Sequence, residues 1–178
     1  AAGELAADEI VPAARTVLLD GADVDAVASV LDAFQRRTPA PGAGSSGPRA
    51  PVTVEVPTRY DGADLDDVAR RWDMTRGEVV LTHSGTEFVV AFCGFAPGFA
   101  YCTGLPPDRW LSRLPTPRSR VPAGSVGLAG EYTGIYPSTS PGGWRLIGRT
   151  DLELWTPEAE QPATLAPGTR VRFTVVEG

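Results

Sequence analysis

The sequence contains no lysine, because all sixteen of its basic residues are arginines. A chain without lysine forms no Schiff base through a side-chain amine, holds no phosphate with a Walker-type lysine and carries no biotin as biotinyl-lysine. The planar arginine side chain is suited instead to carboxylate, phosphate or carbonyl groups. Genome base composition is the alternative explanation for an arginine-only chain.

Cysteine and histidine are also scarce. Cys93 and Cys102 are the only cysteines and His83 is the only histidine, so we expect no metal on this chain. No apolar run has the length of a membrane span, and no basic and then apolar leader is present. We therefore expect a cytoplasmic protein with two free, buried thiols. The chain starts at Ala1 and not at methionine, which leaves a missing N-terminal segment open.

The net charge of −6 argues against general binding to nucleic acid or to an anionic membrane. The charge is distributed unevenly, since residues 104–150 carry six arginines against Asp108 and Glu131. This basic region would attract a small anion. For any one of its arginines, an ordinary surface ion pair is the alternative.

Glycine (20 residues) and proline (17 residues) are frequent, which predicts many turns between short strands. Near the N-terminus, residues 14–19 have the pattern of a strand, and apolar residues at helical spacing follow Asp23, a candidate N-cap. Residues 38–50 have the composition of a flexible linker. We predict a partial α+β domain over 1–37, a linker over 38–50 and a mainly β domain over 51–178.

The second domain begins with a strand and two helices. Apolar residues at helical spacing predict a first helix over 65–72, and the capping-box pair Thr75 and Glu78 predicts the start of a second helix. His83 then falls near the C-terminal end of that helix, where a cation is favoured. A closed or nearly closed β-barrel would hide the strand edges. The predicted strands cover residues 52–56, 87–93, 125–129, 132–136, 144–147, 152–155 and 170–176.

Glycine, proline and aromatic residues gather in three loop clusters, Gly94–Pro107, Arg120–Gly130 and Tyr136–Thr150. Proline and glycine together allow rigid loops whose peptide N–H groups point outward, so we predict that the clusters share a binding cavity. In the third cluster, the turn Ser140–Trp144 would bind an anion with its amides and present Trp144 as a wall. A hairpin turn with a core tryptophan is the alternative.

His83 is a candidate general base, or a donor to a substrate carbonyl, because its ordinary pKa lies near neutrality. A structural histidine that closes a helix is the alternative. The sequence contains no G-x-S-x-G elbow, and only Glu78 and Glu87 are acids close to His83, so we predict no serine-hydrolase triad. A standard phosphate-binding loop is absent as well.

Four sequence blocks carry a resemblance to a known family. They are GFAPGFAY, PR-x-x-VPAGSVG-x-AG, TGIYP-x-x-SPGGWRLIGRT and PGTRVRF, between residues 94 and 173. They resemble the signature blocks of the family that contains the B subunit of 5-oxoprolinase and allophanate hydrolase subunit 1. The resemblance implies a cyclophilin-like β-barrel preceded by a ferredoxin-like α+β domain, which is only partial in this chain.

The resemblance also implies a function. Family members act with a homologous second subunit, and with a third, lactam-utilisation subunit, in the ATP-dependent hydrolysis of an amide or lactam such as 5-oxoproline. We expect ATP to be bound by the complex and a small anionic amide to be the substrate. Two alternatives are a regulatory module that inhibits a histidine kinase and a carboxyltransferase component of a urea carboxylase-like enzyme. Peptidyl-prolyl isomerase activity rests on the barrel fold alone.

Motif position and residue type together select the expected site. We expect catalytic roles for His83, Tyr136 and Arg145, with His83 or Tyr136 polarising the substrate carbonyl and Arg118 or Arg145 holding its carboxylate. The expected substrate-binding residues are Phe95, Pro97, Gly98, Phe99, Arg118, Pro122, Ser125, Ser140, Gly142, Gly143 and Trp144.

Overall fold

The computed structural model describes residues 6–13, 16–35 and 52–176. Contacts between Cα atoms divide the chain into two compact units, Ala1–Arg49 and Ala50–Gly178. The proposed linker over 38–50 and the first two residues of the predicted strand over 14–19 lie outside the described residues.

The first unit consists of a two-stranded antiparallel sheet and one helix. Strands β1 (Glu9–Pro12) and β2 (Val17–Asp20) pair with each other, and α1 (Val24–Gln35) follows. The Asp23 side chain caps α1 by accepting a hydrogen bond from the Ala26 nitrogen at 2.9 Å. The helix and its cap are therefore confirmed, whereas β1 was not predicted.

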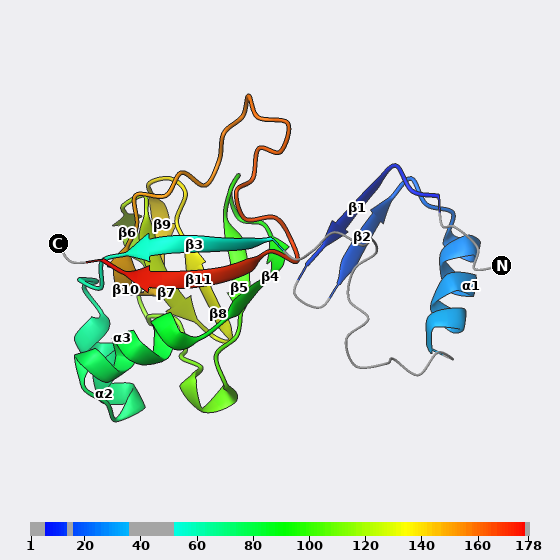
Figure 1. Ribbon diagram of the computed structural model, residues 1–178. Helices are drawn as coiled ribbons and strands as arrows, with labels where there is room; N and C mark the ends of the chain where they lie inside the picture. The colour runs from blue at the N-terminus through cyan, green and yellow to red at the C-terminus, as the bar shows by residue number, and fades with distance from the viewer. Residues whose placement is uncertain (1–5, 14–15, 36–51, 177–178) are drawn as a thin grey trace. The chain divides into compact units, whose positions relative to one another are not determined.

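The second unit is built on a seven-stranded sheet with the order β10-β7-β8-β5-β4-β11-β3. Its neighbours pair antiparallel except for β11 and β3, which run parallel and lie side by side in Figure 1. A separate two-stranded sheet pairs β6 with β9. The strands are β3 (Thr53–Thr58), β4 (Phe88–Cys93), β5 (Ala100–Thr103), β6 (Arg118–Val121), β7 (Ser125–Ala129), β8 (Tyr132–Ile135), β9 (Ser140–Gly142), β10 (Arg145–Arg149) and β11 (Arg170–Val175).

The two edges of the seven-stranded sheet meet at a seam. Arg59, just after β3, forms an antiparallel bridge with Arg149 of β10, and both N–H···O distances are 2.8 Å. The Gly62 nitrogen continues the seam by donating to the Ile147 carbonyl at 3.1 Å. The sheet thus becomes a nearly closed barrel, and the predicted mainly β fold with a barrel is confirmed.

Two helices follow the seam, α2 (Leu65–Trp72) and α3 (Arg76–Gly85). The capping box is formed: the Thr75 hydroxyl accepts from the Glu78 nitrogen at 3.2 Å, and the Glu78 carboxylate accepts from the Thr75 nitrogen at 2.7 Å. α2 packs against β10, and α3 packs against β11. Among the residues described, no helix is both long and apolar enough to cross a membrane.

A large core fills the barrel, and four apolar residues of α2 are buried against it. Hydrophobic burial of this kind contributes roughly 25 cal/mol for each Å² removed from water, so the apolar stripe of α2 holds the helix on the sheet. The predicted spacing over 65–72 is confirmed. The buried residues of the stripe are Leu65, Val68, Ala69 and Trp72.

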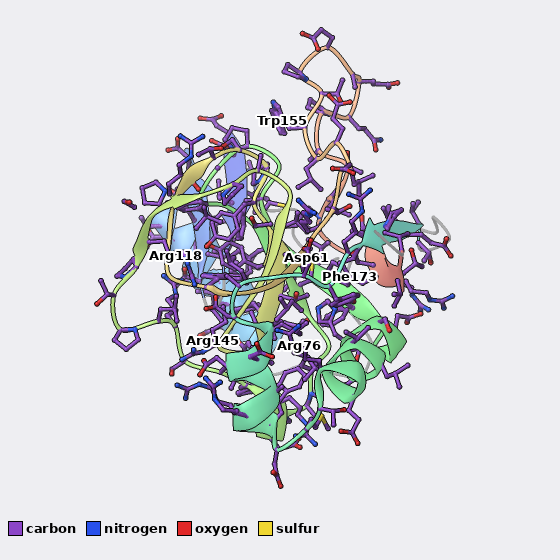
Figure 2. The ribbon with its side chains drawn as sticks, turned by 90° about the vertical axis from the view of Figure 1, so that its left-hand side faces the viewer. Asp61, Arg76, Arg118, Arg145, Trp155 and Phe173 are labelled. Carbon is purple, nitrogen blue, oxygen red and sulfur yellow. The ribbon has the colours of Figure 1, made fainter. Side chains whose placement is uncertain are left out.

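The predicted strand over 152–155 is wrong. This segment opens a long loop that runs to Thr169 and extends away from the barrel, where Figure 2 labels Trp155. Trp155 forms only an isolated bridge with Ala163. The first three residues of the turn predicted over Ser140–Trp144 instead form strand β9, in which Ser140 pairs with Val121.

Substitution of Gly62 by alanine tests the seam, because the added Cβ would lie 2.5 Å from the Gly148 nitrogen in the backbone of β10. We expect Gly62→Ala to lower the free energy of unfolding by at least about 2 kcal/mol, since the two edges would have to separate. Gly85→Ala is the matched control, because nothing lies within 4 Å of its Cβ position. Urea unfolding measures both, and equal stabilities would contradict the role of the seam.

Candidate functional site

An aromatic cavity of about 240 Å³ opens on the surface of the barrel domain. The first and third loop clusters contribute most of its lining, whereas the second cluster contributes none. Six of the expected site residues line it: Phe95, Phe99, Tyr136, Gly142, Gly143 and Trp144. The remaining lining residues are Tyr101, Arg113, Pro117 and Pro141.

Packed rings form the wall of the aromatic cavity. The Phe99 ring lies at the centre, with its centroid 4.9 Å from that of Tyr101, 5.5 Å from that of Tyr136 and 5.3 Å from that of Trp144. Glycine permits this packing: a Cβ on Gly142 would lie 2.8 Å from the Tyr136 ring. Burial raises the pKa of Tyr101 and of Tyr136, so both hydroxyls stay protonated and remain able to donate.

Phe95 stands at the cavity with an unusual backbone. Its φ of 71° lies in the left-handed region, which a bulky residue enters at a cost of about 1 to 3 kcal/mol. Its side chain is 61% exposed, and its ring centroid lies 5.3 Å from that of Phe99. A strained and exposed aromatic residue beside a cavity is typical of a binding site.

Arg118 and Arg145 are both paired with aspartates of this chain, whereas free guanidinium groups were expected at these positions. Arg118 donates to a carboxylate oxygen of Asp64 at 2.7 Å. Arg145, whose side chain is only 3% exposed, forms an ion pair with Asp67 and lies beside α2 in Figure 2. Neither arginine lines the aromatic cavity.

Arg113 is the cation that the cavity does contain. Within the described ranges, no carboxylate pairs with its guanidinium group. Its loop is tied to the third cluster, because the Leu114 nitrogen donates to the Gly143 carbonyl at 2.7 Å. The sequence signal was the run of six arginines over 104–150, but nothing in that run distinguishes Arg113 from the others.

His83 lies in the core, so the structure removes it from the candidate site. Its ring is fully buried, and its two nitrogens lie 2.8 Å from the Tyr60 hydroxyl and 3.0 Å from the Thr133 hydroxyl. Thr133 donates its own proton to the Gly127 carbonyl at 3.3 Å, so Nε2 of His83 is the donor and Nδ1 accepts from Tyr60. Burial lowers the pKa of His83 to about 3, and the ring is neutral.

The other expected residues are dispersed. Pro122 and Ser125 line a separate arginine cavity of about 520 Å³, together with Arg118 and two further arginines. Pro97 and Gly98 belong to the turn between β4 and β5 and do not line the aromatic cavity. Gly98 has a φ of 82° and packs against the Leu154 carbonyl. Ser140 lies in β9, and its buried hydroxyl has no hydrogen-bond partner among the described residues.

The thiols and the acidic side chains are the remaining groups that could hold a metal ion. Cys93 and Cys102 are both free, and Cys102 is buried whereas Cys93 is half-buried. Over the described ranges, no three His, Cys, Asp or Glu side chains come close enough together to hold a metal ion.

His83 makes stability depend on pH. The unfolded chain binds a proton near pH 6.5, but the folded protein does so only near pH 3. Stability from this residue is therefore complete above about pH 6.5 and is lost as the pH falls, by up to about 1.4 kcal/mol per pH unit. We expect the stability difference between wild type and His83→Gln to shrink from about pH 7 to about pH 5. Urea unfolding measures this difference, in which the shared carboxylates cancel, and a difference independent of pH would contradict the prediction.

The family follows from a comparison with known proteins. Residues 4–165 match the family described as carboxyltransferase domain, subdomain C and D, and the chain belongs to this family. The fold agrees with solved structures of related chains. A conserved uncharacterized protein from Pyrococcus horikoshii matches 97% of this chain and 79% of its own, with a TM-score of 0.67 and 33% identity. The urea amidolyase of K. lactis, at 21% identity, shares the fold with a TM-score of 0.68, over 94% of this chain and 12% of its own.

The curated relatives carry a more specific name. The chain is 47% identical over 123 residues to the B subunit of 5-oxoprolinase from Escherichia coli O157:H7, over 67% of this chain and 56% of the relative. It is 43% identical over 123 residues to the same subunit from Bacillus subtilis (strain 168), over 67% and 51%. The resemblance read from the four sequence blocks is confirmed. The chain spans about half the length of these curated relatives.

Proposed function

We propose that this chain is a subunit of an ATP-dependent hydrolase of the 5-oxoprolinase type, and that its aromatic cavity binds a small lactam bearing a carboxylate. The observation that carries the proposal is Arg113, a cation without a carboxylate partner among the described residues, in a cavity otherwise lined by rings, prolines and glycines. The relatives named as 5-oxoprolinase subunits support the same substrate class.

The cavity has groups that could bind both the carboxylate and the ring of such a lactam. A guanidinium group binds a carboxylate through two parallel hydrogen bonds, and Arg113 supplies that group. The aromatic residues that line the cavity supply the apolar contact for a compact ring. Tyr136 is protonated and supplies a hydroxyl donor for the lactam carbonyl.

The rest of the reaction requires partners. This chain has no lysine and no phosphate-binding loop, and His83 is enclosed in the core, so we assign nucleotide binding and the hydrolytic groups to the complex. We propose a homologous second subunit as the direct partner and a lactam-utilisation subunit as a third component. We place the complex in the cytoplasm, where ATP is available.

Arg113→Gln tests the proposed carboxylate contact. Loss of a charge-assisted bidentate contact worth about 1.5 to 3 kcal/mol is expected to raise the KM for 5-oxoproline at least about tenfold. The measurement is glutamate release from 5-oxoproline and ATP by the reconstituted subunits. Arg172→Gln is the control, because Arg172 is exposed on β11 and lines neither the aromatic nor the arginine cavity. Equal KM values in the two variants would contradict the assignment.

Co-purification tests the partner. The second subunit is expected to form a stoichiometric complex with this chain, and turnover is expected only from the complex. Capture of a histidine kinase without any turnover would instead support the regulatory alternative.

A further inference from the structure

We propose that Asp64 and Asp67 are positioning residues of the aromatic cavity, each of which holds one part of it through an arginine. Neither carboxylate lines the cavity, but the contacts of both lead to its lining residues. The identity of the ligand rests on the proposed function, whereas the positioning itself does not.

The first series of contacts starts at Asp64, directly before α2. Asp64 sits at the N-cap position, yet its side chain makes no cap hydrogen bond. Its two carboxylate oxygens accept instead from Arg118 and from the Leu146 nitrogen, both at 2.7 Å. The Asp64 carboxylate therefore stabilises contacts between distant parts of the chain and does not cap the helix.

Arg118 carries this contact to the cavity wall. Its second terminal nitrogen donates to the Trp144 carbonyl at 3.5 Å, and in the β6–β9 sheet Arg118 pairs with Gly142. Trp144 and Gly142 both line the aromatic cavity. Asp64 therefore sets the position of the aromatic wall.

The second series of contacts starts at Asp67, in the first turn of α2. Asp67 pairs with the exposed Arg70 and Arg71 of its own helix and also with the buried Arg145. The Nε of Arg145 donates to the Ser112 carbonyl at 3.1 Å. Ser112 directly precedes Arg113, the cation of the cavity. Asp67 therefore sets the position of the group that binds the carboxylate.

Charge and burial make these contacts stiff. The Arg118 side chain is 31% exposed and that of Arg145 only 3%, so removal of either aspartate leaves a guanidinium group partly or fully buried without its carboxylate. An unpaired buried guanidinium group is unfavourable, so we expect the arginine side chain to shift toward another hydrogen-bond acceptor or toward solvent. Because the two paths end on different parts of the cavity, their losses have different effects on binding.

Two ligands separate the paths: 5-oxoproline, and 2-pyrrolidinone, which has the same lactam ring without the carboxylate. We expect Asp67→Asn to weaken 5-oxoproline binding about tenfold and to leave 2-pyrrolidinone binding unchanged, because only the Arg113 contact is displaced. We expect Asp64→Asn to weaken the binding of both ligands, because the ring wall moves. Isothermal titration of the reconstituted complex measures all affinities.

Asp66→Asn is the matched control. Asp66 lies on the same helix, pairs with Arg76 and has a side chain that is 60% exposed, so its loss is expected to change neither affinity. If Asp67→Asn behaves like Asp66→Asn, or weakens both ligands equally, the positioning role of Asp67 is overturned. If Asp64→Asn does not fold, Arg118→Lys replaces it, because a lysine has no fork to reach both Asp64 and the Trp144 carbonyl.

A spectroscopic readout separates this inference from the proposed function. If the wild type binds neither ligand, the proposed function fails, but backbone amide shifts still test the positioning. Asp67→Asn is then expected to shift the Arg113 amide resonance and Asp64→Asn that of Trp144, whereas Asp66→Asn shifts neither. Unchanged resonances in the first two variants would overturn the inference.

Discussion

The backbone seam between residues 59–64 and β10 is the constraint on which the rest of the barrel domain depends. Beyond the Arg59–Arg149 bridge, the Asp64 nitrogen donates to the Leu146 carbonyl at 2.8 Å. These bonds satisfy the edge groups of β10, which would otherwise be open to pairing with another chain. They also fix where α2 starts, and so they bring Asp64 to Arg118 of β6 and Asp67 to Arg145 of β10.

This arrangement divides the arginines into two groups. Arg118 and Arg145 are held by carboxylates of the same chain and act behind the cavity wall, whereas Arg113 remains available inside it. A buried ion pair adds little net stability when desolvation is counted, but it defines one arrangement of the groups that it joins. The resulting site has a rigid aromatic wall and a positioned cation, and the proposed binding of an anionic lactam uses both.

Local patterns predicted the parts of the fold that local forces decide. The stripe of α2 and the capping box at Thr75 depend on residues within one or two helical turns, and both were found. Strands β5, β6 and β9 were missed, because they lie in or beside segments rich in glycine and proline that are read as loops. Their strand conformation depends on partners elsewhere in the sheet, as in the pairing of Arg118 with Gly142.

The sequence by itself determined the family, the barrel and six of the ten residues that line the aromatic cavity, because motif blocks and residue types are properties of the chain alone. Only the tertiary structure decided which charged residues are free. Asp64 and Arg118 are separated by 54 positions, and Asp67 and Arg145 by 78. No local pattern pairs residues so far apart, and the same holds for His83, which meets Thr133 across 50 positions. A charge or a ring nitrogen serves a ligand only if folding leaves it without a partner, and folding brings distant partners together.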